Sequence, residues 1–139
     1  MFKTILHAND GSEHAFKALS MALDIARQNK AGLHIVSVEE ISYLPEYVEE
    51  VREEKGTAAR RFHAVIRRAT KMAEDREVEL QTHVLVGHPV RDVVELAARL
   101  KADLLVIGAT GHSALYTRMI GSRADRIVQL APCPVLVVK

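Results

Sequence analysis

Residues 104–122 read Leu-Leu-Val-Ile-Gly-Ala-Thr-Gly-His-Ser-Ala-Leu-Tyr-Thr-Arg-Met-Ile-Gly-Ser, and this stretch decides the fold. Its apolar start, 104–107, predicts a buried parallel strand. Its end leads into 123–130, which predicts a helix with Ser122 as the N-cap. A strand that passes through a glycine-bearing loop into a helix N-terminus suits a phosphate group, because backbone N–H groups can approach the anion closely. Taken singly, the same glycines equally mark a strand end, a turn and a helix start.

The bulk composition predicts one soluble globular domain over residues 1–139. Apolar residues make up 48% of the chain and charged residues 27%, which is ordinary for such a domain. The 19 basic and 18 acidic residues nearly balance, which argues against a nucleic-acid or anionic-membrane binder. The sequence has no apolar run of membrane-spanning length and opens directly on a predicted strand. We therefore expect a cytoplasmic protein.

The chain on both sides of this stretch alternates predicted strands with predicted helices. The expected strands are 2–8, 33–38, 78–86, 104–107 and 135–138, and the expected helices are about 12–29, 46–75, 89–100 and 123–130. This order predicts the α/β class, as a doubly wound five-stranded parallel sheet with strand order 3-2-1-4-5 and helices on both faces. The alternating pattern of 78–86 indicates a half-exposed edge strand. Ligands of such sheets bind where the strand order reverses, so Asp10 and the glycine loop should share one crevice.

Several common site patterns are missing from the sequence. There is no G-x-G-x-x-G after the first strand, no G-x-x-x-x-G-K-[ST] and no G-x-S-x-G. The third strand ends in Val86-Gly87 rather than in an aspartate, which argues against a response regulator. The histidines form no i, i+4 pair, so no metal site is predicted, although His88 and His112 are expected to border the crevice. Cys133, between two prolines, is interpreted as a small apolar residue rather than a nucleophile.

Short motifs spread over the whole chain carry a family resemblance. They occupy 10–12, 87–89, 102–104 and 131–138. The most specific one is Gly108-x2-Gly111-x9-Gly121-Ser122, because three glycines and a hydroxyl at fixed spacing are far more selective than one glycine. With these motifs the chain resembles the universal stress protein family, and the glycine spacing matches the pattern G-x2-G-x9-G-[ST] of its ATP-binding branch. The resemblance favours phosphate binding over a purely structural role for the glycines.

The resemblance also implies which residues surround the nucleoside part of ATP. Asp10 would hydrogen-bond the nucleoside. Val38 would line the adenine pocket together with Ala8 and Ile107. A second interpretation of Asp10 is a helix cap, since Glu13 follows three residues later as in a capping box. The two roles are compatible.

At the phosphate end, the resemblance assigns the ribose and phosphate contacts to Gly108, Gly111, Gly121 and Ser122, mostly through backbone N–H groups. Arg123 replaces a residue that is often small and apolar in the family. Its guanidinium would either pair with a phosphate or crowd it. The resemblance implies ATP as the ligand, and it leaves ADP, AMP and an accompanying Mg²⁺ open.

The function implied by the resemblance is that of an ATP-binding cytoplasmic regulator of the stress response. It would act as a homodimer in which the apolar edge 135–138 of two subunits pairs. Two alternatives stay open. The first is a slow ATPase or nucleotide hydrolase, disfavoured because no evident general base or Mg²⁺ carboxylate follows the glycine loop. The second is a nucleotide-free interaction module that docks a protein through Leu115, Tyr116, Met119 and Ile120.

Overall fold

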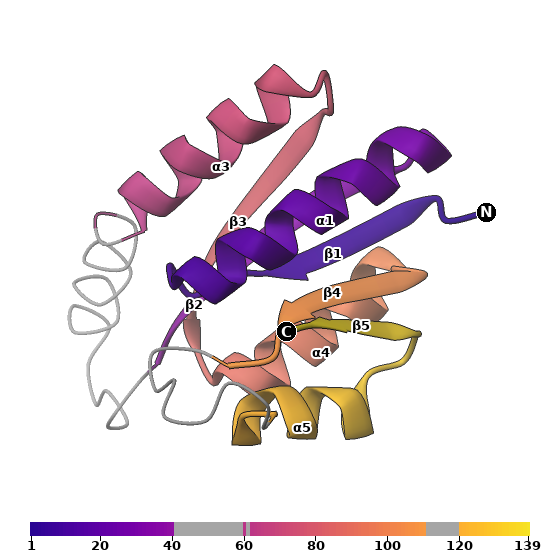
Figure 1. Ribbon diagram of the computed structural model, residues 1–139. Helices are drawn as coiled ribbons and strands as arrows, with labels where there is room; N and C mark the ends of the chain where they lie inside the picture. The colour runs from indigo at the N-terminus through magenta and orange to yellow at the C-terminus, as the bar shows by residue number, and fades with distance from the viewer. Residues whose placement is uncertain (41–59, 61, 111–119) are drawn as a thin grey trace.

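The computed structural model describes residues 1–40, 60, 62–110 and 120–139, which form a parallel sheet covered by helices (Figure 1). The strands are β1 (Thr4–Ala8), β2 (Gly32–Glu40), β3 (Leu80–Gly87), β4 (Leu104–Gly108) and β5 (Val135–Val138). The helices are α1 (Glu13–Asn29), α3 (His63–Asp75), α4 (Pro89–Leu100) and α5 (Ser122–Leu130). All strand pairs are parallel, and their order is β3-β2-β1-β4-β5. The predicted fold class and strand order are confirmed.

Two apolar layers enclose the sheet, one on each face. Figure 1 shows α1 and α3 on one face and α4 and α5 on the other. Successive residues of β1 alternate between these layers, so that Ile5 packs under α1 while Leu6 packs toward α4. Both side chains are fully buried, as expected for the central strand of a sheet covered on both faces.

Helix α1 begins at a side-chain cap, and its buried stripe holds it on the sheet. Ser12 Oγ accepts a hydrogen bond from the Ala15 N–H at 3.2 Å, and Lys30 ends the helix in the left-handed conformation. Helix α3 is fastened to α1 at the surface, where the Arg68 guanidinium forms a bidentate ion pair with Glu13 at 2.8 and 3.1 Å. The same guanidinium lies 3.9 Å above the ring centre of Phe16.

The two edges of the sheet differ in exposure. β3 has exposed residues along its first half, which confirms the predicted half-exposed edge strand. At the opposite edge, β5 is half-buried from Val135 to Val137. In the described part of the chain, no helix is both long enough and apolar enough to cross a membrane.

Among the predicted boundaries that differ from the structure, two lie near the site. Ser122 is not the N-cap of α5: Gly121 holds the cap position, and Ser122 is the first helical residue. β2 continues two residues beyond the predicted end at Val38, because Glu39 and Glu40 pair with the end of β3. The helix predicted over 46–75 is not continuous, because α3 begins at His63 with Phe62 as its N-cap, and residues 46–59 and 61 of that prediction lie outside the described residues.

Candidate functional site

A pocket of about 570 Å³ opens at the carboxyl end of the sheet. The ends of β1, β2 and β4 form its floor, and the first turns of α4 and α5 form one wall. The strand order reverses between β1 and β4, so this is the position where doubly wound sheets bind their ligands. The volume lies in the usual range for a small-molecule site.

The predicted site residues that the structure describes all line this pocket. They are Ala8, Asp10, Val38, Ile107, Gly108, Gly121, Ser122 and Arg123. Gly111 lies outside the described residues, as do His112, Leu115, Tyr116 and Met119. Ile120, the remaining residue of the predicted docking surface, is 42% exposed. His88 is not among the lining residues, because it is exposed at the N-cap of α4 and its N–H donates to Asp92 Oδ2 at 2.9 Å.

Other lining residues were not predicted from the sequence. They are Asn9, Ala15, Val36, Pro89, Val93, Ala109, Thr110, Ala124 and Ile127. Val93 and Ile127 were recognisable only as apolar positions of their helices, and the sequence does not say which of these positions face a pocket. Pro89 carried a signal, since it was predicted at the first position of α4, and that end of the helix meets the crevice.

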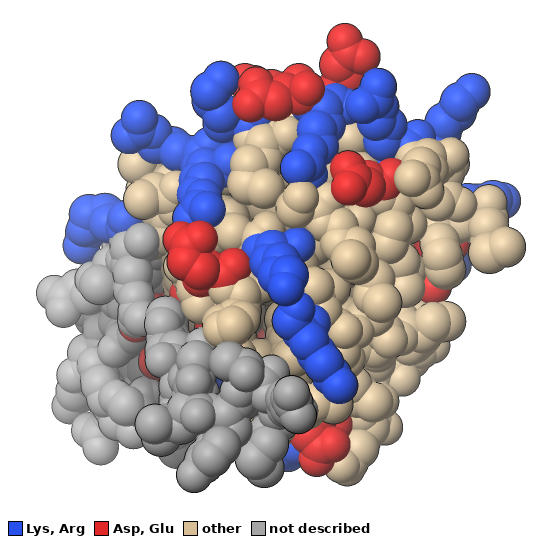
Figure 2. Space-filling view, viewed as in Figure 1, with Lys and Arg blue, Asp and Glu red and all other residues tan. Residues whose placement is uncertain are grey.

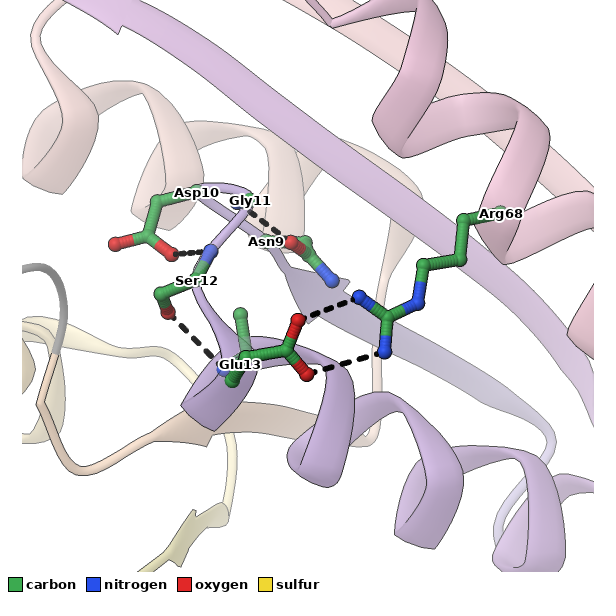
Figure 3. A network of polar contacts seen from close by, with 7 residues as sticks. Asn9, Asp10, Gly11, Ser12, Glu13 and Arg68 are labelled. Atoms are coloured by element: carbon green, nitrogen blue, oxygen red, sulfur yellow. Dashed lines mark hydrogen bonds and ion pairs between the residues drawn. The ribbon is translucent and has the colours of Figure 1, made fainter.

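The turn between β1 and α1 (Figure 3) carries Asp10, which lines the pocket. Asp10 Oδ1 accepts from the Ser12 N–H at 2.9 Å, and Asn9 Oδ1 accepts from the Gly11 N–H at 2.8 Å. Gly11 has φ of +88°, which strongly favours glycine. Figure 3 shows Ser12 bonded into α1 and Glu13 turned toward Arg68. Ser12 is therefore the helix cap, and the capping-box interpretation of Asp10 is wrong: this carboxylate shapes the turn instead.

A buried histidine supports this turn from below. His7 is fully buried, with Nδ1 3.0 Å from the Val106 carbonyl oxygen and Nε2 3.1 Å from Asn9 Nδ2. Because Asn9 Oδ1 already accepts from Gly11, its amide NH₂ must face His7, so Nε2 accepts and Nδ1–H donates to Val106. Burial lowers the pKa of His7 to about 4, and the ring is neutral at pH 7. His7 therefore ties β4 to the turn that carries Asp10.

The N-terminus of α5 supplies backbone donors at the other end of the pocket. Gly121 has no side chain to cap the helix, and the Asp125 N–H makes the first intrahelical bond, to the Gly121 carbonyl. The preceding N–H groups, of Ser122, Arg123 and Ala124, belong to the uncapped first turn, and these three residues line the pocket. The Gly121 N–H itself donates to the Ala109 carbonyl at 2.7 Å, so of the two predicted donors at this end of the loop, the Ser122 N–H belongs to this turn and the Gly121 N–H is used within the fold.

The two described glycines of the motif also have packing reasons. A Cβ on Gly108 would lie 3.2 Å from the His14 carbonyl oxygen, where β4 ends against the start of α1. A Cβ on Gly121 would lie 3.3 Å from the Ala109 oxygen. Close backbone approach therefore accounts for glycine at both positions, alongside any role in binding.

Charged side chains of both signs meet at the pocket. Asp10 lines it from the turn after β1, and Arg123 lines it from the first turn of α5. Arg123 Nη2 donates to Glu40 Oε2 at 2.5 Å, which joins α5 to the end of β2.

Within the described ranges, no group of three or more His, Cys, Asp and Glu residues could hold a metal ion. Cys133 is half-buried and packs against the α4–α5 layer, and burial raises the pKa of its thiol. A raised pKa disfavours the reactive thiolate, which agrees with the prediction that Cys133 is a small apolar residue rather than a nucleophile.

The fold and the pocket together define a doubly wound α/β protein with a pocket of small-molecule size at its switch point. Residues 1–139 match the Universal stress protein family, and the chain belongs to that family. It is 37% identical over 139 residues to a universal stress protein of Thermus aquaticus, with each chain covered completely.

Solved structures of the family have the same fold. The universal stress protein UspA from Lactobacillus plantarum superposes with a TM-score of 0.83 at 28% identity, covering 99% of this chain and 97% of that one. A universal stress protein in complex with cAMP superposes with a TM-score of 0.77 at 28% identity, with the same coverage.

Proposed function

We propose that the protein binds an adenine nucleotide, with ATP as the leading candidate, in the pocket between β1 and β4 and acts as a regulator. The observation that carries the proposal is the meeting in one pocket of an apolar end, a carboxylate and an uncapped helix N-terminus. The cAMP complex of a relative at 28% identity supports an adenine nucleotide as the class of ligand.

In this proposal the ligand lies across the carboxyl ends of the strands. Ala8, Val38 and Ile107 supply apolar surface for the base, and the Asp10 carboxylate accepts hydrogen bonds from the nucleoside. The phosphates face the first turn of α5, where N–H groups without an intrahelical acceptor and the positive end of the helix dipole stabilise negative charge. Ser122 adds a hydroxyl donor there, and ADP or AMP would use the same contacts with fewer phosphates.

A binding protein fits the described pocket better than an enzyme does. Among the described lining residues, the charged side chains are Asp10, at the nucleoside end, and Arg123. The Glu40 carboxylate, which lies next to Arg123, is paired with that guanidinium. Neither Asp10 nor Glu40 is therefore positioned as a general base beside the terminal phosphate, and the two do not form a carboxylate pair for Mg²⁺. Slow hydrolysis stays the alternative, and turnover above roughly one per second, the low end of ordinary enzymes, would favour it.

Two further features of the proposal concern the assembly and its setting. We place the protein in the cytoplasm as a homodimer whose β5 strands pair across a two-fold axis. β5 is an edge strand, and apolar side chains on the preceding helix are exposed, with Val128 44% and Leu130 54% accessible. An unpaired apolar edge invites pairing with a second chain.

Thermal unfolding with and without ligand tests the binding. ATP at a hundredfold excess over its Kd should stabilise the protein by about 2.7 kcal/mol, which raises Tm by several degrees. Val38→Trp fills the pocket from β2 and should abolish the shift. Met21→Trp, at an exposed position of α1 on the other face, is the matched control and should keep it. No shift of the wild-type Tm with ATP, ADP or AMP at millimolar concentration would refute the proposed function.

A further inference from the structure

An ion pair lies where the phosphates of the proposed ligand would arrive. Arg123 is the second residue of α5 and lines the pocket, and its Nη2 donates to Glu40 Oε2. Eighty-three positions separate the two residues in the sequence. Glu40 is the last residue of β2, which the fold extends beyond its predicted end by pairing with Gly87.

Strand geometry directs Glu40 to the pocket side of β2. Side chains two residues apart share one face of a strand, and Val38, two positions earlier, lines the pocket. Glu39, between them, belongs to the opposite face. The carboxylate of Glu40 therefore lies at the rim of the pocket, on the side where Arg123 enters it.

The ion pair is too exposed to be a strong structural link. The two side chains are 58% and 57% accessible, and pairs of this kind add little to the stability of a fold. A phosphate group, in contrast, offers a guanidinium several oxygens and a higher charge than a carboxylate does. An anionic ligand can therefore displace Glu40 from Arg123. The displaced carboxylate stays at the rim of the pocket, and its negative charge repels the phosphates of the ligand.

We propose that Glu40 competes with the ligand's phosphates for Arg123 and so limits how strongly the pocket prefers more highly charged nucleotides. The inference rests on the proposed function and adds a selectivity residue to it. With Glu40 present, the positive charge of Arg123 is already paired with a carboxylate before any ligand binds. With Glu40 neutral, the guanidinium is available, and each added phosphate should increase affinity more steeply.

Isothermal titration calorimetry with ATP, AMP and adenosine tests this inference. Glu40→Gln keeps the shape and polarity of the side chain while removing its charge. We expect ATP to bind about two- to fivefold more tightly, the effect of one exposed charge near the phosphates, with a smaller gain for AMP and none for adenosine. The gain should shrink when the salt concentration rises from 0.05 to 0.5 M, because screening weakens both charges.

A double-mutant cycle separates competition from a general change of charge. In an Arg123→Gln background the gain from Glu40→Gln should mostly disappear, because no guanidinium remains to be released. Glu74→Gln, on an exposed site of α3 on the other face of the sheet, changes the net charge equally and should leave ATP affinity unchanged.

The inference is overturned if Glu40→Gln leaves ATP affinity unchanged or tightens adenosine equally, or if its gain is the same with and without Arg123. In these cases the wild type still binds nucleotide, and the proposed function stands. If the wild type binds none of the three probes, the proposed function fails and the inference fails with it.

Discussion

His7 combines complete burial with two polar contacts that only one protonation state satisfies. The neutral ring donates from Nδ1 to Val106 and accepts at Nε2 from Asn9. A second ring proton would face the Asn9 NH₂ group, whose orientation is fixed by the Gly11 N–H. The geometry of the turn that presents Asp10 therefore depends on a neutral imidazole one residue below the end of β1.

This dependence predicts an acid-sensitive stability. The pKa of His7 falls from 6.5 in the unfolded chain to about 4 in the fold, chiefly through burial. The unfolded state binds the proton first, so the stabilisation is complete above pH 6.5 and decreases as the pH falls toward 4, by about 3 kcal/mol in total. Lowered pKa values of His34 and His83 act in the same direction. Urea unfolding at several pH values gives the unfolding free energy as a function of pH. Between pH 6.5 and 4 this free energy should fall clearly less for His7→Gln than for the wild type. An equal fall in both proteins would contradict the role of His7.

At the scale of the elements, α1 and α5, which both contribute residues to the pocket, begin differently. α1 has a capping hydroxyl, Ser12, whereas α5 begins at Gly121 without a side-chain cap. The contrast follows their proposed roles, because a helix end filled by its own side chain has fewer N–H groups left for a ligand.

Paired serine substitutions test this difference. Ser12→Ala should cost about 1 kcal/mol of unfolding free energy, the usual value of an N-cap. Ser122→Ala should change it by less than about 0.5 kcal/mol, because that hydroxyl caps nothing in the described structure. Chemical denaturation of both variants measures the two costs. A large cost for Ser122→Ala would restore Ser122 as the cap, as the sequence suggested.

The sequence predicts elements well and contacts between distant elements poorly. Apolar runs and alternation located each strand to within two residues, and the glycine pattern located Gly108 and Gly121, which both line the pocket. The position of the α5 cap was missed because both Gly121 and Ser122 suit an N-cap. The contacts of His7 with Val106 and of Arg123 with Glu40 depend on how β1, β4 and the end of β2 align, which no local pattern contains.

At the scale of the whole molecule, β5 decides how two copies could associate. The carbonyl groups of Pro134 and Val138 accept hydrogen bonds from β4 and the residue after it. Backbone groups alternate sides along a strand, so those of Val135 and Val137 point to the open edge. A second β5 could therefore pair there without disturbing the existing sheet.

A proline at this edge tests the dimer. Val137→Pro removes an outward N–H but none that serves β4, so the monomer should fold while the pairing of two β5 strands is lost. Light scattering after size exclusion should give a dimeric mass for the wild type and for the control Val137→Ala, and a monomeric mass for Val137→Pro. A wild type that is monomeric at micromolar concentration would contradict the proposed assembly.

The central claim is that the β1–β4 pocket holds an adenine nucleotide, and a titration of the ¹⁵N-labelled protein with ATP, followed by its amide NMR signals, tests it most directly. We predict saturable shifts concentrated at Asp10, Gly108 and the first turn of α5, from Ser122 to Ala124, with little change on α3. Saturable shifts confined to another surface, or none at millimolar ATP, would contradict the account.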